Sequence, residues 1–402
     1  MSKPFAGIRV VDFTQVISGP YATYQLAAQG ADVIKIEQPK GGDQGRYLLS
    51  TSAHIKSIGM SALYTSVNGG KRSLTLDLKH PDAREVVEKL VASADVLVEN
   101  FKAGTMDRLG YGYAAMREIK ADLVYCSISG FGQTGPRSQA AAYDPVVQAA
   151  SGIMSVTGHP QTGPTKVGFW VTDMAAGMNG AMAISAALFR RATSGEGAFI
   201  DVSMLDTAVS LMSPLMSLFL NYGIEAPLTG NGTPGTGGSS TVYDTQQGSI
   251  TVAAATDGQA AALAKALGLP EVADDPRFRL REDRLQNTEL YRSLIAPAFE
   301  HDTASNWEQR LAAVGVPACK NLSVAEVAVD AQIQHRQSIQ TLPAARGMQG
   351  EFSAINLGFK VNADGPHISG PPPALGQHSD EILAEFGYDE EQISVLRASG
   401  AV

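Results

Sequence analysis

The chain has 402 residues, of which 44% are hydrophobic and 18% are charged, a composition typical of a globular protein with two or three domains. Its net charge of −9 would repel a phosphate polymer, which argues against nucleic acid as a partner. Two distant cysteines, Cys126 and Cys319, argue against a disulfide scaffold and fit a reducing compartment.

The N-terminal stretch lacks the apolar core of a signal peptide, and no apolar run reaches the roughly 18 residues that a membrane helix needs. We therefore expect a soluble, cytoplasmic protein that has no membrane partner. The first half of the chain alternates β-rich runs with helical patterns. Strands are expected at residues 7–13, 31–37, 72–78, 95–100 and 122–129, and helices at 19–30, 81–94 and 114–120.

Strands separated by helices need crossover connections, so this half is expected to form a mostly parallel sheet with helices on both faces. Ligands of such folds bind beyond the carboxyl ends of the strands. Four residues at or just after these strand ends are therefore expected near one rim: Glu37, Asn100, Phe101 and Gly130.

After about residue 224 the composition changes, with a stretch rich in Gly, Thr, Ser and Pro at 229–240, and this change indicates a second domain. A hairpin is expected at 240–256 with its turn at Gln247-Gly248, and helices are expected near 258–267, 287–300, 304–314 and 379–397. The expected fold class is α/β. It combines a Rossmann-like large domain (1–200 and 340–402), a smaller α+β domain (226–335) and linkers (201–225 and 336–339).

The sequence "GFGQTG" (130–135) follows an expected strand and matches the GxGxxG pattern. A dinucleotide site needs the third Gly inside a helix and an acidic residue about 20 positions further on. Here Pro136 and Arg137 interrupt the pattern, and residues 150–160 hold no acid. The preferred interpretation is a turn that offers backbone N–H groups to an anion.

The sequence argues against a metal site and a serine hydrolase, and it leaves the role of one glycine-rich stretch open. The seven histidines show no HxxxH or HExxH pairing, so no metal site is expected, and a GxSxG nucleophile elbow is absent. The glycine-rich stretch 229–240 could be an interdomain linker or a flap that offers N–H groups to an oxyanion. Its composition favours the linker.

Asp173 is the only charged residue between Lys166 and Arg190. The commonest role for an Asp before a helix is an N-cap, where the helix dipole favours its charge. The apolar "VGFWVT" before it would partly desolvate the carboxylate, and the small residues after it would let a ligand approach. A nucleophile, kept ionised by the helix terminus near its free pKa of about 3.9, is the alternative.

Seven segments in one order carry a more specific pattern. They are "GIRVVDFTQVISGPYATYQLAAQGADVIKIEQPKGGD" (7–43), "NGGKRSLTLDLK" (68–79), "DVLVENFKAGTMDRLGYGY" (95–113), "YCSISGFGQTGP" (125–136), "YDPVVQAASGIMSVTG" (143–158), "TDMAAGMNGAMAISAALFRRATSGEGAFIDVSMLD" (172–206) and "PALGQHSDEILAEFGYDEEQI" (373–393). Together they resemble the family III CoA-transferases, the group that includes formyl-CoA transferase and carnitine CoA-transferase.

The resemblance implies that Asp173 is the catalytic nucleophile of a CoA-transferase. In the family's mechanism this carboxylate attacks an acyl-CoA to give a mixed anhydride, and CoA thiolate converts the anhydride into an aspartyl-CoA thioester. An acceptor carboxylate then takes over the CoA. Covalent catalysis of this kind divides one difficult exchange into easier steps, and partial burial keeps water from the anhydrides.

The resemblance also implies which residues contact coenzyme A. They are Val16, Lys79, Asn100, Phe101, Arg108, Tyr143 and Asp144. The implied substrates are an acyl-CoA thioester and small carboxylic acids, with no permanently bound cofactor. An interlocked homodimer, in which each chain threads through its partner, is expected as well.

Three departures from formyl-CoA transferase bear on the substrate. That enzyme has Gln where Ile17 stands, Arg where Gln38 stands and Lys where Ala141 stands. The missing Gln argues against a formyl or oxalate substrate, and small dicarboxylates such as succinate are expected instead. The changes at Gln38 and Ala141 imply that one or two phosphate contacts differ.

Two alternatives stay open at this point. The related α-methylacyl-CoA racemases pair the equivalent of Asp173 with a His, where this chain has Tyr143, a poor base because the free pKa of tyrosine is about 10. A CoA- or dinucleotide-binding protein without catalysis is the other alternative, suggested by GFGQTG and the strand–helix alternation.

Overall fold

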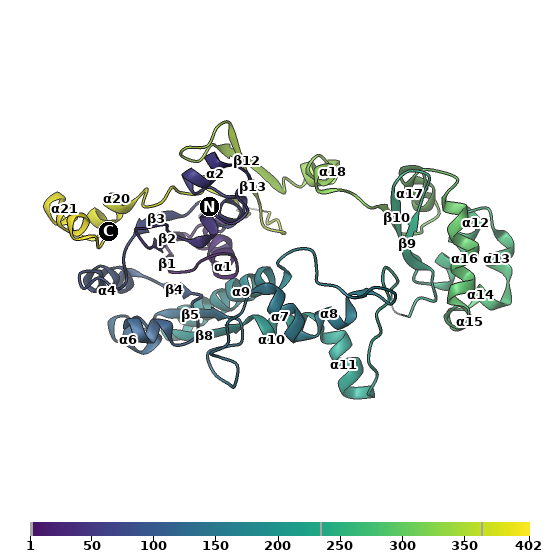
Figure 1. The fold of residues 1–402 in the computed structure, drawn as a ribbon, viewed down its shortest axis with the longest axis horizontal. Helices are drawn as coiled ribbons and strands as arrows, with labels where there is room; N and C mark the ends of the chain where they lie inside the picture. Colours follow the sequence, from purple (N-terminus) through teal and green to yellow (C-terminus); the bar gives the residue numbers. More distant parts are fainter. Residues whose placement is uncertain (1–2, 234, 363–364) are drawn as a thin grey trace. The chain divides into compact units, whose positions relative to one another are not determined.

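The computed structural model describes residues 3–233, 235–362 and 365–402, and the chain forms two compact units (Figure 1). Unit 1 comprises Met1–Ile153, Lys166–Ile224 and Ala331–Val402. Unit 2 comprises Met154–Thr165 and Glu225–Asp330. The chain therefore enters unit 2 twice, first through a short excursion and then through a longer one.

Unit 1 is built on a six-stranded sheet in the order β3-β2-β1-β4-β5-β8, in which every neighbouring pair is parallel. Its strands are β1 (Arg9–Asp12), β2 (Asp32–Glu37), β3 (Arg72–Thr75), β4 (Val96–Glu99), β5 (Val124–Ser129) and β8 (Ala198–Ser203). The expected parallel sheet and the α/β fold class are confirmed. From β1 the chain adds β2 and β3 on one side, and it then returns to add β4, β5 and β8 on the other side. The boundary between β1 and β4 is therefore the topological switch point, where ligands of such sheets bind.

Helices surround this sheet, and a small antiparallel ribbon adds to unit 1. The helices are α1 (Ser18–Ala28), η1 (Gln44–Arg46), α2 (Ala53–Ile58), α3 (Ala62–Asn68), α4 (Ala83–Ser93), α5 (Thr105–Leu109), α6 (Tyr113–Ile119), α7 (Asp144–Ser151), α9 (Val171–Ser194), α10 (Met204–Leu211), α11 (Ser213–Tyr222), α19 (Ala331–His335), α20 (Ser379–Glu385) and α21 (Glu390–Ser399). The ribbon pairs β12 (Ile339–Pro343) with β13 (Glu351–Ile355). Helix α8 (Ile153–Val156) lies where the chain first passes into unit 2.

One face of the sheet packs against α4, α6 and the C-terminal helices. The shared core joins Val11 and Leu97 of the sheet to Val87 of α4, Met116 of α6 and Ile382 of α20, all of them buried. Burial of such apolar side chains contributes about 1.5–3 kcal/mol each. The last hundred residues of sequence thus complete a core that the first hundred begin.

The other face carries α1 and α9, which pack closely because α9 is rich in small residues. A Cβ at Gly177 would lie 2.6 Å from the backbone oxygen of Ser18, and a Cβ at Gly180 would lie 3.0 Å from Ile128. The small side chains noted in the sequence therefore serve helix packing, and this packing fixes the start of α1 against the first turns of α9.

The C-terminal segment differs from the single helix expected at 379–397. Gly387 has φ 84°, a left-handed conformation that ends a helix readily only at glycine. Asp389 then starts α21 with a capping box to Gln392. Two helices result in place of one.

Residues 201–225, expected as a linker, mostly form two helices of unit 1. Ser203 accepts a hydrogen bond from the backbone of Asp206 and so caps α10, and Pro214 begins α11. In the described part of the chain no single helix is long and apolar enough to span a membrane. The pair α10 and α11 passes a length and composition test together, but it is bent by 75°.

Unit 2 has its own core between a three-stranded sheet and helices. The expected hairpin at 240–256 is confirmed by β9 (Ser240–Asp244) and β10 (Ser249–Ala253), and β11 (Ala318–Lys320) pairs antiparallel with β10. The helices are α12 (Asp257–Ala266), α13 (Pro270–Asp274), α14 (Pro276–Arg279), α15 (Arg281–Gln286), α16 (Thr288–Phe299), α17 (Ala304–Ala313) and α18 (Val324–Ala328). A short ribbon joins β6 (Gly158–His159) to β7 (Gly163–Pro164).

The glycine-rich stretch 229–240 belongs to unit 2 and is not the free linker that its composition favoured. The Gly230 amide donates to the backbone of Gly158, and Gly237 lies so close to Arg284 that a Cβ would approach within 2.6 Å. Glycine serves close packing here. The possible role of this stretch as a flap over a site stays a prediction.

Candidate active site

A cavity of about 300 Å³ lies at the carboxyl ends of β1, β4 and β5, at the topological switch point of unit 1. Its lining residues come from the loops after these strands and from the helices that start there. They are Gln15, Val16, Ile17, Ser18, Gln44, Asn100, Phe101, Lys102, Ile128, Ser129, Gly130, Ala142, Tyr143, Asp173 and Met204. Among the described residues of this lining, Asp173 is the one carboxylate and Lys102 the one cation.

Asp173 is the third residue of α9 and is partly buried. The N-cap position of α9 is Trp170, which makes no side-chain capping bond, so the capping interpretation of Asp173 is wrong. The cap comes instead from Asp144 of α7. Its Oδ2 accepts hydrogen bonds from the Thr172 amide (2.7 Å), the Thr172 hydroxyl (2.8 Å) and the Asp173 amide (3.3 Å).

Burial and, to a smaller extent, the neighbouring negative charge of Asp144 together raise the pKa of Asp173 to about 7, although a hydrogen bond from Ser18 opposes the shift. The expectation of an ordinary pKa of about 3.9 is therefore corrected. The helix terminus does little for Asp173 because the carboxylate of Asp144 already occupies the first amides of α9. Near neutral pH Asp173 is therefore divided between its protonated and its ionised form.

This electrostatic arrangement predicts the pH dependence of the reaction. If Asp173 acts as a carboxylate, kcat/KM should rise with pH through an apparent pKa of about 7. In Asp144→Asn the like charge is gone, so the acid limb should move to lower pH. Initial rates between pH 5 and 9 measure both profiles, with thermal melting as the control for folding. An acid limb at the same pH in both proteins would contradict the coupling.

Five of the eight predicted site residues line the cavity: Val16, Asn100, Phe101, Tyr143 and Asp173. Asp144 does not join them. It is 2% exposed, and its Oδ1 accepts from Gln148 while its Oδ2 holds α9, so both oxygens are committed within the chain. We therefore reassign Asp144 from a CoA contact to an electrostatic and structural partner of Asp173.

The two predicted phosphate-binding cations lie outside the cavity lining. Lys79 is exposed, and its backbone amide donates to Asp77. Arg108 is exposed on α5, where its guanidinium donates to Thr105 of the same helix at 2.9 Å. Their assignment to CoA stays a prediction.

Glu37, which was expected at the rim, is corrected to a buried structural residue. It is 4% exposed and binds the Arg46 guanidinium through both oxygens, at 2.7 Å each. Asn100, Phe101 and Gly130 do reach the cavity as expected. Asn100 holds the loop after β1, since its side chain accepts from the Gln15 amide at 2.7 Å and donates to the Gln15 carbonyl at 2.8 Å.

Several lining residues carried no distinctive signal in the sequence. Gln15, Ser18, Gln44, Lys102, Ser129 and Met204 fall in this class. Lys102 directly follows the predicted Asn100-Phe101 pair, so its position alone could have suggested it. The others depend on how loops far apart in sequence come together.

The GFGQTG turn does bind an anion, but that anion belongs to the chain. The Gln133 amide donates to Oδ2 of Asp201 at 2.9 Å. Gly130, the first glycine, admits Ala142, because a Cβ there would lie 2.2 Å from the Ala142 side chain. The turn therefore shapes one wall of the cavity. Among the described residues no group of three or more His, Cys, Asp or Glu side chains is placed to hold a metal.

The fold and the site define an α/β protein with a partly buried carboxylate in a cavity at the sheet's switch point. Residues 5–379 match the model of CoA-transferase family III. The chain belongs to the family III CoA-transferases. Its enzymatic activity is accordingly the transfer of CoA between an acyl-CoA and a carboxylic acid.

Several known proteins are similar to this chain over almost its whole length. Succinyl-CoA:glutarate CoA-transferase of Mus musculus is 33% identical, covering 100% of this chain and 90% of the relative. Succinyl-CoA:mesaconate CoA-transferase of Haloarcula marismortui is 36% identical, covering 95% and 96%. A crystal structure of a CaiB/BaiF family protein from Brucella suis superimposes with a TM-score of 0.86 at 31% identity, covering 96% and 100%.

Proposed function

We propose that the enzyme transfers CoA by covalent catalysis at Asp173. Its carboxylate attacks the thioester carbonyl of the donor, the C–S bond breaks, and CoA leaves as a thiolate. The thiolate attacks the aspartyl carbonyl of the resulting anhydride, which releases the donor acid and forms an aspartyl-CoA thioester. The acceptor carboxylate then attacks the aspartyl carbonyl of this thioester, which releases CoA thiolate and forms a second anhydride, between Asp173 and the acceptor. The thiolate attacks the acceptor's carbonyl in this anhydride, which gives the new acyl-CoA and frees the carboxylate of Asp173.

The observation that carries this proposal is the setting of Asp173, a partly buried carboxylate that lines a cavity of about 300 Å³. Partial desolvation strengthens a carboxylate nucleophile and limits hydrolysis of the anhydrides. The backbone of Asn100 and Phe101 and the side chain of Val16 would form the wall against CoA. Lys79 and Arg108, which lie outside the cavity lining, would supply charge for the phosphates.

We further propose that both acids exchanged by the enzyme are four- or five-carbon dicarboxylates. Ile17, 4% exposed in the cavity wall, offers no polar group where formyl-CoA transferase has Gln. Two relatives cited above act, by name, on succinyl-CoA with glutarate or mesaconate as the acid. A second carboxylate on the substrate would find its counter-charge at Lys102.

A panel of donors and acceptors tests this choice. With succinyl-CoA as the donor, kcat/KM for four- and five-carbon dicarboxylates should exceed that for the monocarboxylates formate and acetate by about tenfold or more, the value of one well-placed ion pair. Chromatography of the CoA esters formed measures each rate. In Lys102→Met this preference should shrink, whereas an unchanged preference, or a preference for oxalate, would contradict the assignment.

We also propose that the enzyme works as a homodimer. Met178, Met182 and Phe189 form one stripe along α9 and are 54%, 66% and 75% exposed, and Leu220 and Tyr222 of α11 are exposed too. Apolar side chains grouped in this way on a single chain mark an interaction surface. Sedimentation equilibrium that finds only monomer at micromolar concentration would contradict the proposal.

A further inference from the structure

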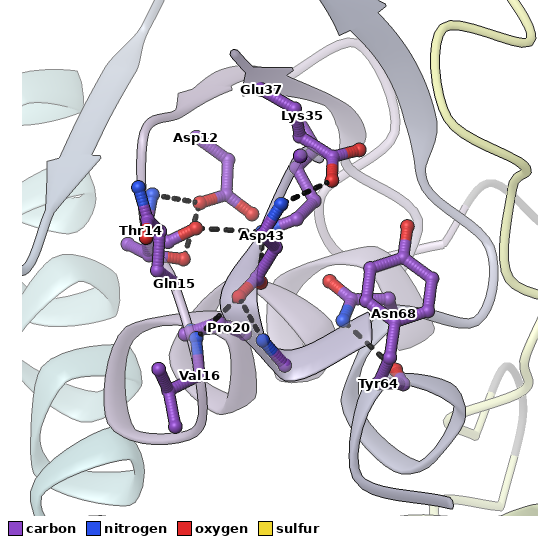
Figure 2. A network of polar contacts seen from close by, with 12 residues as sticks. Asp12, Thr14, Gln15, Val16, Pro20, Lys35, Glu37, Asp43, Tyr64 and Asn68 are labelled. Atoms are coloured by element: carbon purple, nitrogen blue, oxygen red, sulfur yellow. Dashed lines mark hydrogen bonds and ion pairs between the residues drawn. The ribbon is translucent and has the colours of Figure 1, made fainter. Parts of the chain in front are cut away.

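A network of buried charges contacts the loop after β1, whose residues Gln15 and Val16 line the cavity. Figure 2 shows Asp12, Lys35 and Asp43 around this loop. Asp12, Lys35 and Asp43 are each no more than 1% exposed. Lys35 pairs with Asp43 at 2.9 Å, and Lys71 pairs with Asp12 at 3.0 Å. Buried pairs of this kind rarely add net stability over apolar residues, because desolvation offsets their attraction. Their contacts to the loop give a more specific reason for their presence.

The backbone of residues 14–16 is held by these charges group by group. Oδ1 of Asp12 accepts from the Thr14 amide at 2.9 Å, and Nζ of Lys35 donates to the Thr14 carbonyl at 2.6 Å. Oδ1 of Asp43 accepts from the Val16 amide at 2.9 Å and from the Gly45 amide at 2.7 Å. The loop after β1 is therefore tied to β2 and to the start of η1 by side chains that water does not reach.

Val16 shows what this anchoring achieves. Its φ is 69°, in the left-handed region that a β-branched residue rarely adopts. Such a conformation persists only where the surroundings enforce it, and enforced conformations are concentrated at functional sites. Val16 and Ile17 line the cavity, and the next residue, Ser18, donates to Asp173. The strained residue therefore sets the wall next to the nucleophile.

We propose that Asp43, held in place by Lys35, is a positioning residue that locks Val16 in its left-handed conformation and so shapes the CoA-binding wall. This role rests on the proposed function of the cavity. Asp43 does not line the cavity and would act on the substrate only through the loop. Its loss should therefore weaken CoA binding more than it slows the chemical steps.

The test compares Asp43→Ala in the wild-type and Val16→Gly backgrounds. Asp43→Ala should raise the Kd for CoA, and the KM for succinyl-CoA, about tenfold, with kcat changed less. Glycine adopts positive φ without strain. In the Val16→Gly background the same substitution should therefore change Kd by no more than about threefold. A comparable rise in both backgrounds would overturn the proposal.

Two further variants separate positioning from general destabilisation. Glu37→Gln removes the charge that pairs with Arg46 but keeps an oxygen to accept from the Asp43 amide, so it should lower the melting temperature without raising Kd by more than about twofold. Asp43→Asn keeps an oxygen for the Val16 amide and should bind CoA more tightly than Asp43→Ala. If Asp43→Ala fails to fold, Asp43→Asn is compared in the two backgrounds. It loses the ion pair with Lys35 that holds the side chain, so its smaller rise in Kd should again be found only where Val16 is present, and an equal rise in both backgrounds would overturn the proposal.

Calorimetric Kd values for CoA also keep this proposal distinct from the proposed function. A wild-type protein that binds CoA but transfers it to no acid would refute the transferase mechanism. The background-dependent change in Kd would still be measured in that protein. A Kd that follows the melting temperature across all variants, regardless of Val16, would refute the positioning role alone.

Discussion

Asp173→Asn is expected to lower transfer activity by about 10⁴-fold or more while CoA still binds, because an amide cannot form the anhydride. The cavity lining is otherwise unchanged, and the amide is close in size to the carboxyl group. Steady-state rates with succinyl-CoA and calorimetric binding of CoA measure the two properties. A variant that transfers CoA at a rate within tenfold of the wild type would contradict the role of Asp173.

The same variant is expected to be more stable than the wild type at pH 8. Because burial raises the pKa of Asp173 to about 7, the folded state resists ionisation between about pH 4 and 7 while the unfolded state ionises freely. The wild type therefore loses stability as pH rises through this window, by at most about 4 kcal/mol. Urea unfolding at pH 5 and pH 8 should show the advantage of Asp173→Asn growing with pH. An equal difference at both pH values would contradict the shifted pKa.

Arg46→Met is expected to destabilise the protein by about 3–5 kcal/mol, because it leaves the carboxylate of Glu37 buried without its partner. Burial opposes ionisation of Glu37, but the hydrogen bonds and charge of Arg46 hold its pKa below the usual range. Arg46 also donates to the Tyr64 hydroxyl at 2.6 Å and to the Pro373 carbonyl at 3.3 Å. It thereby ties the C-terminal connector to the sheet.

A double variant provides the control for this prediction. In Glu37→Leu/Arg46→Met no unpaired charge remains, so the loss measured by urea unfolding should be smaller than in Arg46→Met alone. If the double variant loses as much free energy of unfolding as Glu37→Leu and Arg46→Met lose in sum, the ion pair is not the cause.

Local sequence patterns predicted much of unit 1, because strand and helix periodicity and helix caps are properties of neighbouring residues. The strand expected at 31–37 is β2 (Asp32–Glu37), and the helix at 81–94 is α4 (Ala83–Ser93). The split after α20 was missed because a single glycine, Gly387, breaks an otherwise continuous helical pattern. Helices α10 (Met204–Leu211) and α11 (Ser213–Tyr222) were missed, since their residues were expected to form a linker.

The sequence could predict a site residue only where its place directly after a strand of the parallel sheet decides its position. Asn100 and Phe101 follow a central strand and reach the cavity as expected. Asp144 could not be assigned correctly, because its hydrogen bonds to the start of α9 join residues 28 positions apart. The pKa of Asp173 was mispredicted for the same reason. Long-range packing decides that Asp144, and not Asp173, accepts the hydrogen bonds of the first amides of α9.

Chemical trapping of a covalent intermediate is the experiment that decides whether Asp173 is the nucleophile. The wild type is incubated with succinyl-CoA, quenched with hydroxylamine and digested, and the peptide that contains Asp173 is analysed by mass spectrometry. Covalent catalysis at Asp173 should give a hydroxamate at this residue in the wild type and none in Asp173→Asn. A wild-type enzyme that turns over with no hydroxamate at Asp173, or with one on a different carboxylate, would contradict it.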